Sequence, residues 1–513
     1  MKLTGVSRYT YKPRKTEEIT KMKKQIISVT LAALMLAAAP ISARAYSVPG
    51  ESGAVLESYA SEADDAFDCE VLSDGTVKIK KYCGTAASIE VPSTVNGAPV
   101  TVIGNNSFQE CKELVSVTLP DTVIEIGTCA FHSCDLLENV KMPAHVKTIE
   151  NMAFSACPKL KTVSFGDSLE FIGNQAFAGD KSLGKIILPD TVKTIEANAF
   201  LKCAAASELK LGNSVEKIGQ SAFEGCDGIK SVVLPDSLTE LAGHTFRNCD
   251  SLASVTIGKG LETIPTYSFA ENPSLTEVKM PNTIKTIGQA AFRSCTSLRS
   301  ITLPTSLEMI DNEAFMATSV LESIEIPSRT TKIGCEAFIY SGVKSIKIHG
   351  SLEAVPKNCF TYCKQLETVE ITGAVKALEH EAFGSCDSLK SITLPDSVEK
   401  IHDYAFSNSK DVVIKCYPDS YAEKYAKEKN IAYELLERPK GKYGDVDGDG
   451  EITSNDALAI LRTSVGLGKL TADQKNLADV DLDGQITSND ALEVLRYSVG
   501  LASADSMVNT PLV

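Results

Sequence analysis

The chain has 513 residues, a formal net charge of −15 at pH 7, fifteen cysteines and no tryptophan. This length allows several domains, and the acidic balance argues against a nucleic-acid-binding protein, because phosphates and surface carboxylates repel each other. Beyond residue 45 no stretch is apolar enough to span a bilayer, so a membrane-spanning protein is not expected either.

The N-terminal 45 residues are typical of a secretory signal peptide. A basic segment precedes an apolar run from Ile26 to Ala39, and Ala43-Arg44-Ala45 provides a cleavage site. The run is too short for a membrane span of ~20 residues. We expect residues 1–45 to be removed, with Met22 as the true start, because the preceding residues only lengthen the basic segment. The mature protein is therefore expected to be secreted.

Two short segments lead into the main body of the chain. Residues 46–63 are acidic and rich in small side chains, and we expect them to form a flexible lead-in. Residues 64–107 are expected to form an N-terminal cap hairpin and a first repeat. Apolar residues alternate from Phe67 to Tyr82 around Ser73-Asp74-Gly75, which is typical of a β-hairpin.

Residues 108–436 carry an internal repeat. Phe recurs every 23 residues from Phe108 to Phe338, and again at Phe360, Phe383 and Phe406. The unit reads Leu-x-x-Val-x-Leu-Pro-x-x-Val-x-x-Ile-Gly-x-x-Ala-Phe-x-x-Cys. A fixed period of about 20 to 29 residues predicts a solenoid of the leucine-rich-repeat type, built from short parallel strands and helical turns.

One unit shows how the repeat should fold. Val117 and Leu119 alternate, so we expect them to point inward from a short strand. Phe131 and Cys134 are expected on the buried face of a helical turn. Because stacked strands lie ~4.8 Å apart, the coils should form a rod of roughly 65 Å.

These residues resemble the BspA-type leucine-rich repeat of bacterial surface and secreted proteins. Asn96-Gly97-Ala98-Pro99-Val100 is similar to the first repeat of that family, and the segment from Ser420 to Leu436 is similar to its closing helix and strand. The resemblance runs from about Phe67 to Leu436. It implies binding or adhesion and fixes no ligand.

Nine cysteines occupy one position of the repeat, three residues after Phe. A secreted chain invites disulfides, and neighbouring coils would bring these residues within bridging distance. However, the count is odd, and one small, buried side chain per coil is typical of packing. We therefore expect free buried thiols, and no metal site, because neither CxxC nor a nearby His accompanies them. The nine are Cys111, Cys134, Cys157, Cys203, Cys226, Cys249, Cys295, Cys363 and Cys386.

After a linker at residues 437–444, residues 445–502 contain two patterns typical of calcium-binding loops. Each loop has carboxylates at positions 1, 3, 5 and 12 and glycine at position 6. Ca²⁺ takes six to eight oxygens, and this spacing places them around one point, with a carbonyl from position 7 and a hydroxyl or water at position 9. We expect two Ca²⁺ ions per chain. The expected ligands are Asp445, Asp447, Asp449, Glu451, Thr453 and Asp456 in the first loop, and Asp479, Asp481, Asp483, Gln485, Thr487 and Asp490 in the second.

A helix is expected after each loop. Leu458, Leu461 and Val465 have helical spacing ahead of Gly466, and the same pattern recurs 34 residues on. Between them, Thr471-Ala472-Asp473-Gln474 is typical of a capping box that starts a short third helix. This order resembles the type I dockerin, a small module that attaches secreted proteins to cohesins on a cellulosome scaffold. The resemblance runs from Tyr443 to about Ala502.

The dockerin resemblance implies which residues contact a cohesin, namely loop positions 10 and 11 and residues two turns into the following helix. The segments that begin at Asp445 and Asp479 agree at 18 of 23 positions, including residues expected to face water. Two interchangeable binding faces would explain this agreement, and a recent duplication explains it equally well. Residues 503–513 are expected to form a tail. The implied contacts are Ser454, Asn455, Arg462 and Thr463 in the first copy, and Ser488, Asn489, Arg496 and Tyr497 in the second.

The expected protein is a non-catalytic binding or adhesion protein, secreted and held on a cell-surface cellulosome through its dockerin. Its solenoid ligand is a protein or a polysaccharide, and the absence of Trp and of aromatic residues in the outward strand column favours a protein. An enzyme that degrades plant-wall polysaccharides is the remaining alternative. The chain has no GxSxG, HExxH, Walker or GxGxxG signature, and its six His fall at variable repeat positions.

Overall fold

The protein is described from a computed structural model, which covers residues 66–437, 441–501 and 507–510. The expected signal peptide and lead-in lie outside these residues. Within them, no helix combines the length and the apolar character that crossing a membrane requires.

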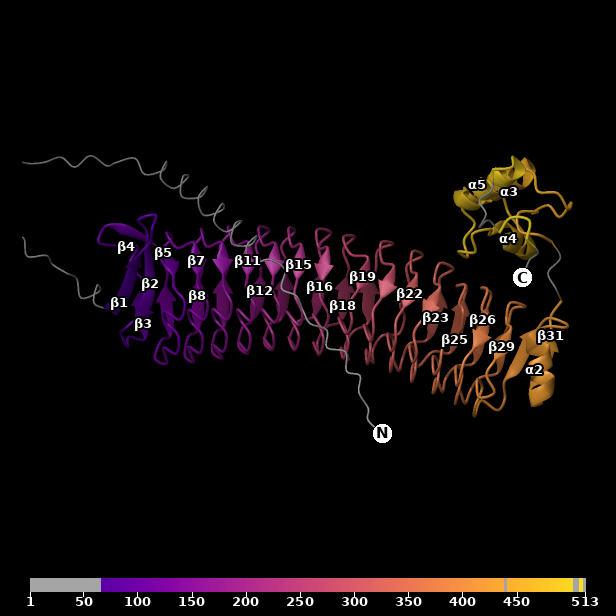
Figure 1. Ribbon diagram of the computed structural model, residues 1–513, viewed down its shortest axis with the longest axis horizontal. Helices are drawn as coiled ribbons and strands as arrows, with labels where there is room; N and C mark the ends of the chain where they lie inside the picture. Colours follow the sequence, from indigo (N-terminus) through magenta and orange to yellow (C-terminus); the bar gives the residue numbers. More distant parts are fainter. Residues whose placement is uncertain (1–65, 438–440, 502–506, 511–513) are drawn as a thin grey trace, which may run out of the picture. The chain divides into compact units, whose positions relative to one another are not determined.

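The solenoid begins with a hairpin that closes its first coil. Strands β1 (Phe67–Val71) and β2 (Val77–Tyr82) pair antiparallel, as the alternation predicted. The ring of Tyr82 stacks on that of Phe108, with centroids 5.4 Å apart, and so covers the end of the core. Strands β3 (Ser88–Glu90), β4 (Thr94–Val95) and β5 (Ala98–Ile103) complete the first repeat (Figure 1).

A parallel-strand solenoid of about 16 turns follows, as predicted. Its first ladder consists of three- and four-residue strands. In each three-residue strand the central apolar side chain points inward between neighbours that face outward, as Val117 does between Ser116 and Thr118. The four-residue strands place a second apolar side chain in the core. The strands are β6 (Ser116–Thr118), β8 (Asn139–Lys141), β10 (Thr162–Ser164), β12 (Lys185–Ile187), β14 (Glu208–Lys210), β16 (Ser231–Val233), β18 (Ser254–Thr256), β20 (Glu277–Lys279), β23 (Ser323–Ile326), β25 (Ser345–Ile348), β26 (Thr368–Ile371) and β28 (Ser391–Thr393).

A second ladder of two-residue strands runs along the solenoid and was not predicted from the sequence. Each strand places an Ile or Leu in the core, where it is buried in nearly every coil. The strands are β7 (Glu125–Ile126), β9 (Thr148–Ile149), β11 (Phe171–Ile172), β13 (Thr194–Ile195), β15 (Lys217–Ile218), β17 (Glu240–Leu241), β19 (Thr263–Ile264), β21 (Thr286–Ile287), β22 (Met309–Ile310), β24 (Lys332–Ile333), β27 (Ala377–Leu378) and β29 (Lys400–Ile401).

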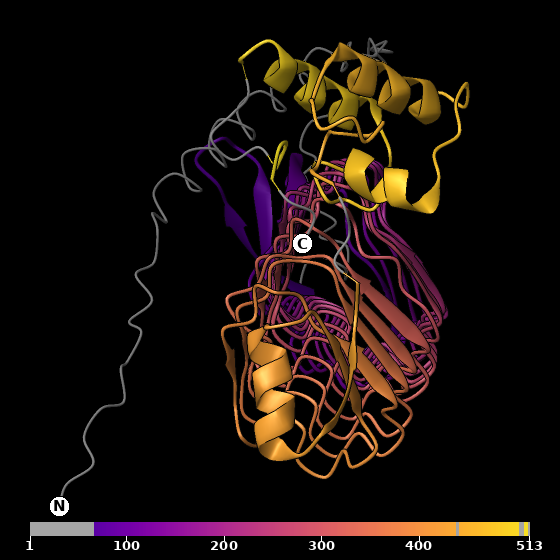
Figure 2. The ribbon, with the colours of Figure 1, turned by 90° about the vertical axis from the view of Figure 1, so that its right-hand side faces the viewer.

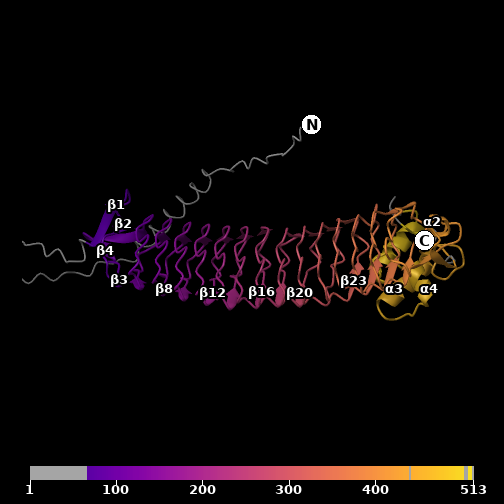
Figure 3. The same ribbon diagram turned by 90° about the horizontal axis from the view of Figure 1, so that it is seen from below.

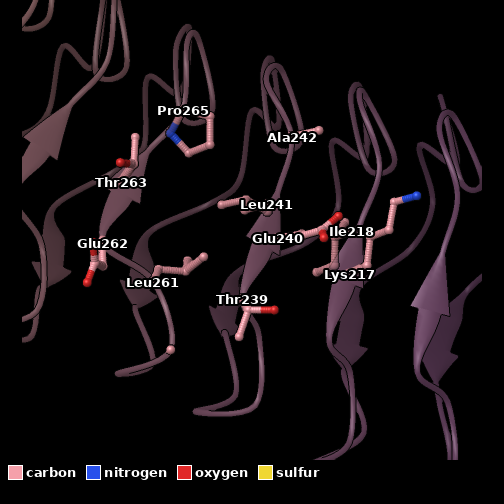
Figure 4. A pocket seen from close by; sticks show the side chains of 11 residues that line it. Lys217, Ile218, Thr239, Glu240, Leu241, Ala242, Leu261, Glu262, Thr263 and Pro265 are labelled. Atoms are coloured by element: carbon pink, nitrogen blue, oxygen red, sulfur yellow. The ribbon is translucent and has the colours of Figure 1, made fainter. Parts of the chain in front are cut away.

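Two prolines interrupt this second ladder. The residue after each strand normally donates its N–H to the preceding coil, as Ala242 does to Ile218 O over 2.9 Å. Pro265 and Pro356 occupy that place and have no N–H to donate. The ladder accordingly stops between β17 and β19 and again between β24 and β27. At the first gap a hollow of about 670 Å³ lies between neighbouring coils, lined among others by Leu241 and Thr263 (Figure 4).

The segment around each Phe forms a third set of contacts between coils. In the coil of Phe131, the N–H groups of Cys129, Phe131 and Ser133 donate to carbonyls of the next coil over 2.9, 2.6 and 2.9 Å. Cys129 and Ser133 have φ of 54° and 59°, and the same two places are left-handed in nearly every coil. The sequence predicted a helical turn here. The N–H groups between these donors turn back within the coil, as that of Ala130 does to Gly127 O over 3.2 Å. The segment is therefore a series of turns with left-handed residues four positions apart, and every second N–H donates to the next coil.

The phenylalanine side chains are buried, as the repeat predicted, and their rings stack through the centre of the coils. From Phe108 to Phe406, successive centroids lie 4.8 to 5.9 Å apart with nearly parallel planes. Figure 3 shows the coils side by side, and Figure 2 shows them end-on. Offset aromatic stacking and complete burial make this column the largest apolar contribution of each coil.

The cysteines that follow Phe are buried hydrogen-bond donors. In eight coils the Sγ atom donates to the carbonyl of the Phe one coil back, over 3.1 to 3.2 Å. No disulfide joins cysteines within the described residues. Their state in solution stays a prediction.

The solenoid closes with the helix and strand that the sequence predicted. Strand β30 (Val413–Cys416) pairs with β31 (Ala432–Leu435), and helix α2 (Tyr421–Lys429) lies between them in the chain. Ser420 caps α2, and Asn430 ends it in the left-handed conformation. The Tyr425 hydroxyl donates to His402 O over 3.3 Å, which fixes the helix against the last coils.

Candidate metal loops and docking surface

The C-terminal module consists of three helices, each of which was predicted. Helices α3 (Ser454–Ser464) and α5 (Ser488–Ser498) follow the two loops, and α4 (Ala472–Ala478) lies between them with the expected capping box of Thr471 and Gln474. Ile460 and Val494 are fully buried at the centre of the apolar core that α3 and α5 share.

Residues after α5 also belong to this module. Val508 is buried in the core, and the Asn509 N–H donates to Tyr443 O over 2.7 Å. The Tyr443 N–H donates in turn to Thr510 O over 2.9 Å. The sequence indicated only a tail at residues 503–513. The four described residues, 507–510, are too few to show a helix or strand pattern. The described part of that tail fastens the end of the module to its beginning.

The first loop brings its first three carboxylates together. One oxygen from each of Asp445, Asp447 and Asp449 lies within 4.8 Å of the others. Gly448 and Gly450 have φ of 76° and 91°, so glycine permits the sharp turn there. The Oδ1 atom of Asp445 is buried and has no hydrogen-bond partner. A buried carboxylate oxygen aimed at a carboxylate cluster fits a hard cation such as Ca²⁺.

The second loop repeats this geometry. Asp479, Asp481 and Asp483 also place one oxygen each within 4.8 Å of the others. Gly484 has a φ of 77°, and Leu482 adopts a φ of 58° where the first loop has Gly448. The two loops therefore hold the same backbone path with different residues at position 4.

The carboxylates at position 12 lie elsewhere. Asp456 Oδ1 accepts from the N–H groups of Val446 and Asp447, over 2.9 and 3.2 Å, and Oδ2 accepts from the Thr453 N–H over 2.8 Å. Asp490 repeats these bonds in the second loop. In this geometry the short Asp side chain closes the loop onto the N-terminus of its helix and does not join the cluster of three.

The remaining expected ligands lie at the loop exits. The hydroxyls of Thr453 and Thr487 accept from Asn455 N and Asn489 N, each over 3.1 Å, and so cap α3 and α5. The N–H of Glu451 donates to Asp449 Oδ1 over 2.8 Å, and that of Gln485 does the same to Asp483. Their side chains are exposed, so only their carbonyls remain as loop ligands.

Clustered carboxylates disfavour their own charge. Burial and the neighbouring Asp490 raise the pKa of Asp479 to about 7, and burial, Asp490 and Asp483 raise the pKa of Asp481 to about 6. The pKa of Asp447 is also raised, although a hydrogen bond from the Asp449 N–H lowers it, because burial and nearby carboxylates prevail. A divalent cation would relieve this repulsion.

The leucines that predicted the two helices do not point into the core. Leu458 and Leu461 are 43% and 41% exposed, and their counterparts Leu492 and Leu495 are 45% and 42% exposed. Ala457, Ile460 and their counterparts fill the core instead, so the helical spacing was right, but these leucines do not mark the buried face. Between α3 and α5 these leucines border a groove of about 320 Å³ whose lining pairs by the 34-residue offset: Ser454, Ala457, Leu458, Leu461, Ser488, Ala491, Leu492 and Leu495.

The residues expected to contact a partner divide into two groups. Ser454, Asn455 and Arg462 are exposed at the ends of α3, and Ser488, Asn489 and Arg496 are exposed on α5. Thr463 and Tyr497 are half-buried: the Thr463 hydroxyl donates to Ala459 O over 2.9 Å, and Tyr497 packs against the core. The exposed leucines between these groups are the part of the surface that sequence reasoning missed.

One row on the solenoid has the composition of a catalytic triad. His349 Nδ1 lies 2.7 Å from Thr372 Oγ1, and Nε2 lies 2.9 Å from Glu325 Oε1. The N–H groups of Thr372 and Gly373 both donate to Ile348 O, over 2.9 and 3.1 Å. Backbone donors beside the hydroxyl are therefore occupied, and an acyl-transfer site needs such donors free for its oxyanion. The row is a set of hydrogen bonds between coils.

Comparison with known families matches both parts of the chain. The family model described as "BspA type Leucine rich repeat region (6 copies)" matches residues 78–207, 194–321 and 285–413, well over half of the chain. The model described as "Dockerin type I domain" matches residues 443–497. No curated protein matches.

Two of the similar solved structures are of bacterial leucine-rich-repeat proteins. A leucine-rich cell surface protein from Faecalibacterium prausnitzii is 26% identical, with 70% of this chain and 95% of that chain covered and a TM-score of 0.43. A leucine-rich-repeat protein from Bacteroides ovatus is 24% identical, with 68% and 98% covered and a TM-score of 0.35. On the family models, the chain belongs to the BspA-type leucine-rich-repeat family and carries a type I dockerin at its C-terminal end.

Proposed function

We propose that the protein is a secreted, non-catalytic binding or adhesion protein, displayed on a cellulosome scaffold through Ca²⁺-dependent binding of its dockerin to a cohesin. The observation that carries this proposal is the groove between α3 and α5, whose exposed leucines lie between two matched sets of polar residues. Apolar side chains rimmed by polar groups are typical of a protein-binding surface.

The two loops support the metal dependence. Asp445, Asp447 and Asp449 would hold one ion, and Asp479, Asp481 and Asp483 would hold the other. A bound Ca²⁺ would neutralise each cluster and fix the loop that begins the following helix. Since Asp456 and Asp490 tie the same loops to α3 and α5, metal binding is coupled to the placement of the groove.

The metal step is tested on the full chain. Calorimetry should count about two Ca²⁺ ions per chain, and circular dichroism should show a gain of helix as Ca²⁺ is added. Changing Asp445, Asp447 and Asp449 to Asn should remove one ion, whereas Asp473→Asn, on the exposed side of α4, should remove none. No heat and no gain of helix would refute the proposal.

The docking step needs its own experiment. A cohesin of the same scaffold system, immobilised on a sensor, should capture the chain in Ca²⁺ and release it in a chelator. Leu461→Asp with Leu495→Asp should abolish capture while both ions still bind, because a charge in the groove must be desolvated. Unchanged capture by this variant would place the binding surface elsewhere.

The ligand of the solenoid is proposed to be another protein. The solenoid's outward strand column lacks aromatic side chains, which sugar rings usually require for stacking. Capture by the solenoid from secreted proteins, compared with binding to wall polysaccharides, tests this preference. Tight binding to a polysaccharide would favour the second candidate, a carbohydrate-binding module.

A further inference from the structure

The residue three positions after each Phe has a defined task. Its backbone N–H or its side chain can donate a hydrogen bond to two carbonyls, that of its own Phe and that of the Phe one coil back. Cysteines donate to the latter, and Ser409 Oγ donates to Phe383 O over 2.7 Å in the same way. The place therefore selects side chains that carry a hydrogen to donate.

Asn272 shows how an amide side chain fits this position. Its Oδ1 accepts from the Cys249 N–H over 2.8 Å, and its Nδ2 donates to Phe246 O and Phe269 O, each over 2.9 Å. The amide is fully buried and its polar groups are satisfied. At this position the atom on one branch of the side chain accepts a hydrogen bond, and the atom on the other branch must donate one.

Asp180 occupies the equivalent place three residues after Phe177. Its Oδ1 accepts from the Cys157 N–H over 2.8 Å, the same bond that Asn272 makes. Its Oδ2 is buried without a partner, and the residue is fully inaccessible to water. Because Oδ1 accepts the equivalent N–H in both residues, Oδ2 should take the place of the Asn272 NH₂ group, which would set it against the carbonyls of Phe154 and Phe177.

The surroundings offer nothing to balance a negative charge. The titratable groups that face Asp180 from the neighbouring coils are the thiols of Cys157 and Cys203, whose pKa values it helps to raise. Lys181 follows in sequence and is exposed. A carboxylate oxygen against two carbonyl oxygens is repulsive, whereas a carboxylic acid donates to one of them.

We propose that Asp180 is a protonated carboxylic acid in the folded protein at neutral pH, and that loss of its proton loosens the solenoid around Cys157 and Cys203. Burial raises the pKa of Asp180 well above its usual range, and the hydrogen bond from the Cys157 N–H offsets this only in part. Asp180 thus makes the stability of the central coils depend on pH.

The direction of the dependence follows from proton binding. The unfolded chain releases this proton near pH ~4, and the folded chain keeps it. Between that pH and the folded-state pKa, the unfolded state binds fewer protons, so stability falls as pH rises. The folded-to-unfolded ratio should decrease about tenfold per pH unit from this group alone.

The test compares the full chain with its D180N variant by hydrogen exchange of amides in the coils of Cys157 and Cys203. Between pH 5 and 7, the ratio of the opening constants of the two proteins should change about tenfold per unit, with D180N the more stable at pH 7. Asp250→Asn, at an exposed carboxylate, should give a constant ratio. A constant ratio for D180N as well would overturn the proposal.

The reciprocal variant N272D and an infrared measurement guard against a folding defect in D180N. N272D should import the same pH dependence into the coils of Cys249 and Cys295. At pH 7 and with Ca²⁺ added to neutralise the loop carboxylates, wild type labelled with ¹³C-Asp should show the carbonyl band of a buried, protonated carboxylic acid, and labelled D180N should lack it. Finding carboxylate bands alone in the labelled protein would overturn the proposal without any variant.

Discussion

The solenoid and the C-terminal module both repeat a unit, but they keep different residues constant. In the solenoid the recurring side chains are buried, as the Phe column and the Cys positions are, and the exposed positions vary from coil to coil. In the module the 34-residue repeat extends to exposed residues, including Leu461 with Leu495 and Arg462 with Arg496. Packing alone explains the first pattern and leaves the second unexplained.

This difference separates a framework from a contact surface. A coil needs only its inward residues to stack on the next one, so its outward residues are free to differ. If α3 and α5 matched only because of packing, their buried residues, such as Ile460 and Val494, would need to be similar. Their exposed leucines would not need to match. A partner that binds either copy would require the exposed residues of the two copies to match.

The largest expected effect on stability comes from changing a buried residue of the solenoid. Phe223→Ala removes a fully buried ring from the middle of the stack and should lower the free energy of unfolding by about 3–5 kcal/mol. Urea unfolding followed by circular dichroism measures this loss. Val233→Ala, at a side chain that is 65% exposed on β16, is the control and should change stability by less than about 0.5 kcal/mol. Equal losses in both variants would remove the distinction between inward and outward residues.

The exposed side predicts an effect that depends on how many copies are changed. Ser454, Asn455 and Arg462 changed together to Ala should weaken cohesin binding by only about 0.4 kcal/mol, because one of two equal modes is lost. Changing Ser488, Asn489 and Arg496 should do the same, and changing all six should cost several kcal/mol. Titration calorimetry against one cohesin distinguishes the three variants.

The two copies are not fully equal, which sharpens this prediction. Arg496 Nη1 lies 2.7 Å from Glu493 Oε1, and the first copy has Ala459 in the place of Glu493. If one triple variant alone abolishes binding, the module has a single face and the matching residues record duplication. Glu493→Ala should then reduce the difference in cohesin binding between the two copies.

Another prediction concerns the left-handed positions beside each Phe. Gly179 has a φ of 82°, and a Cβ there would make only an ordinary contact with Ala156, so Gly179→Ala should cost about 1–2 kcal/mol from backbone strain alone. Ala317 has a φ of 58° at the same place in a later coil, and Ala317→Gly should gain a similar amount. Thermal unfolding of both variants is the measurement, and effects of the same sign would contradict the assignment of strain.

The sequence predicted which side chains recur in the core, and it missed backbone features such as the second ladder and the left-handed positions, although these recur as well. The 23-residue period of Phe predicted the core column, and the spacing of Asp445, Asp447 and Asp449 predicted their convergence. Pro265 breaks a ladder whose two-residue strands carry too little periodicity to be recognised. Leu458 and Leu461 have the spacing of a core face, and only the packing of Ala457 and Ile460 shows that another face is buried.

The gaps at Pro265 and Pro356 have a mechanical consequence. A rod held by a module at its C-terminal end carries any pull along its axis, through the hydrogen bonds that join one coil to the next. At most coils, bonds of the second ladder share this load with those of the first ladder and those around Phe, but at these two gaps the second ladder is absent. The first ladder is interrupted elsewhere, between β10 and β12, β14 and β16, and β20 and β23. The solenoid therefore resists tension unevenly along its axis, and it would yield at these interrupted coils while the blocks between them stay folded.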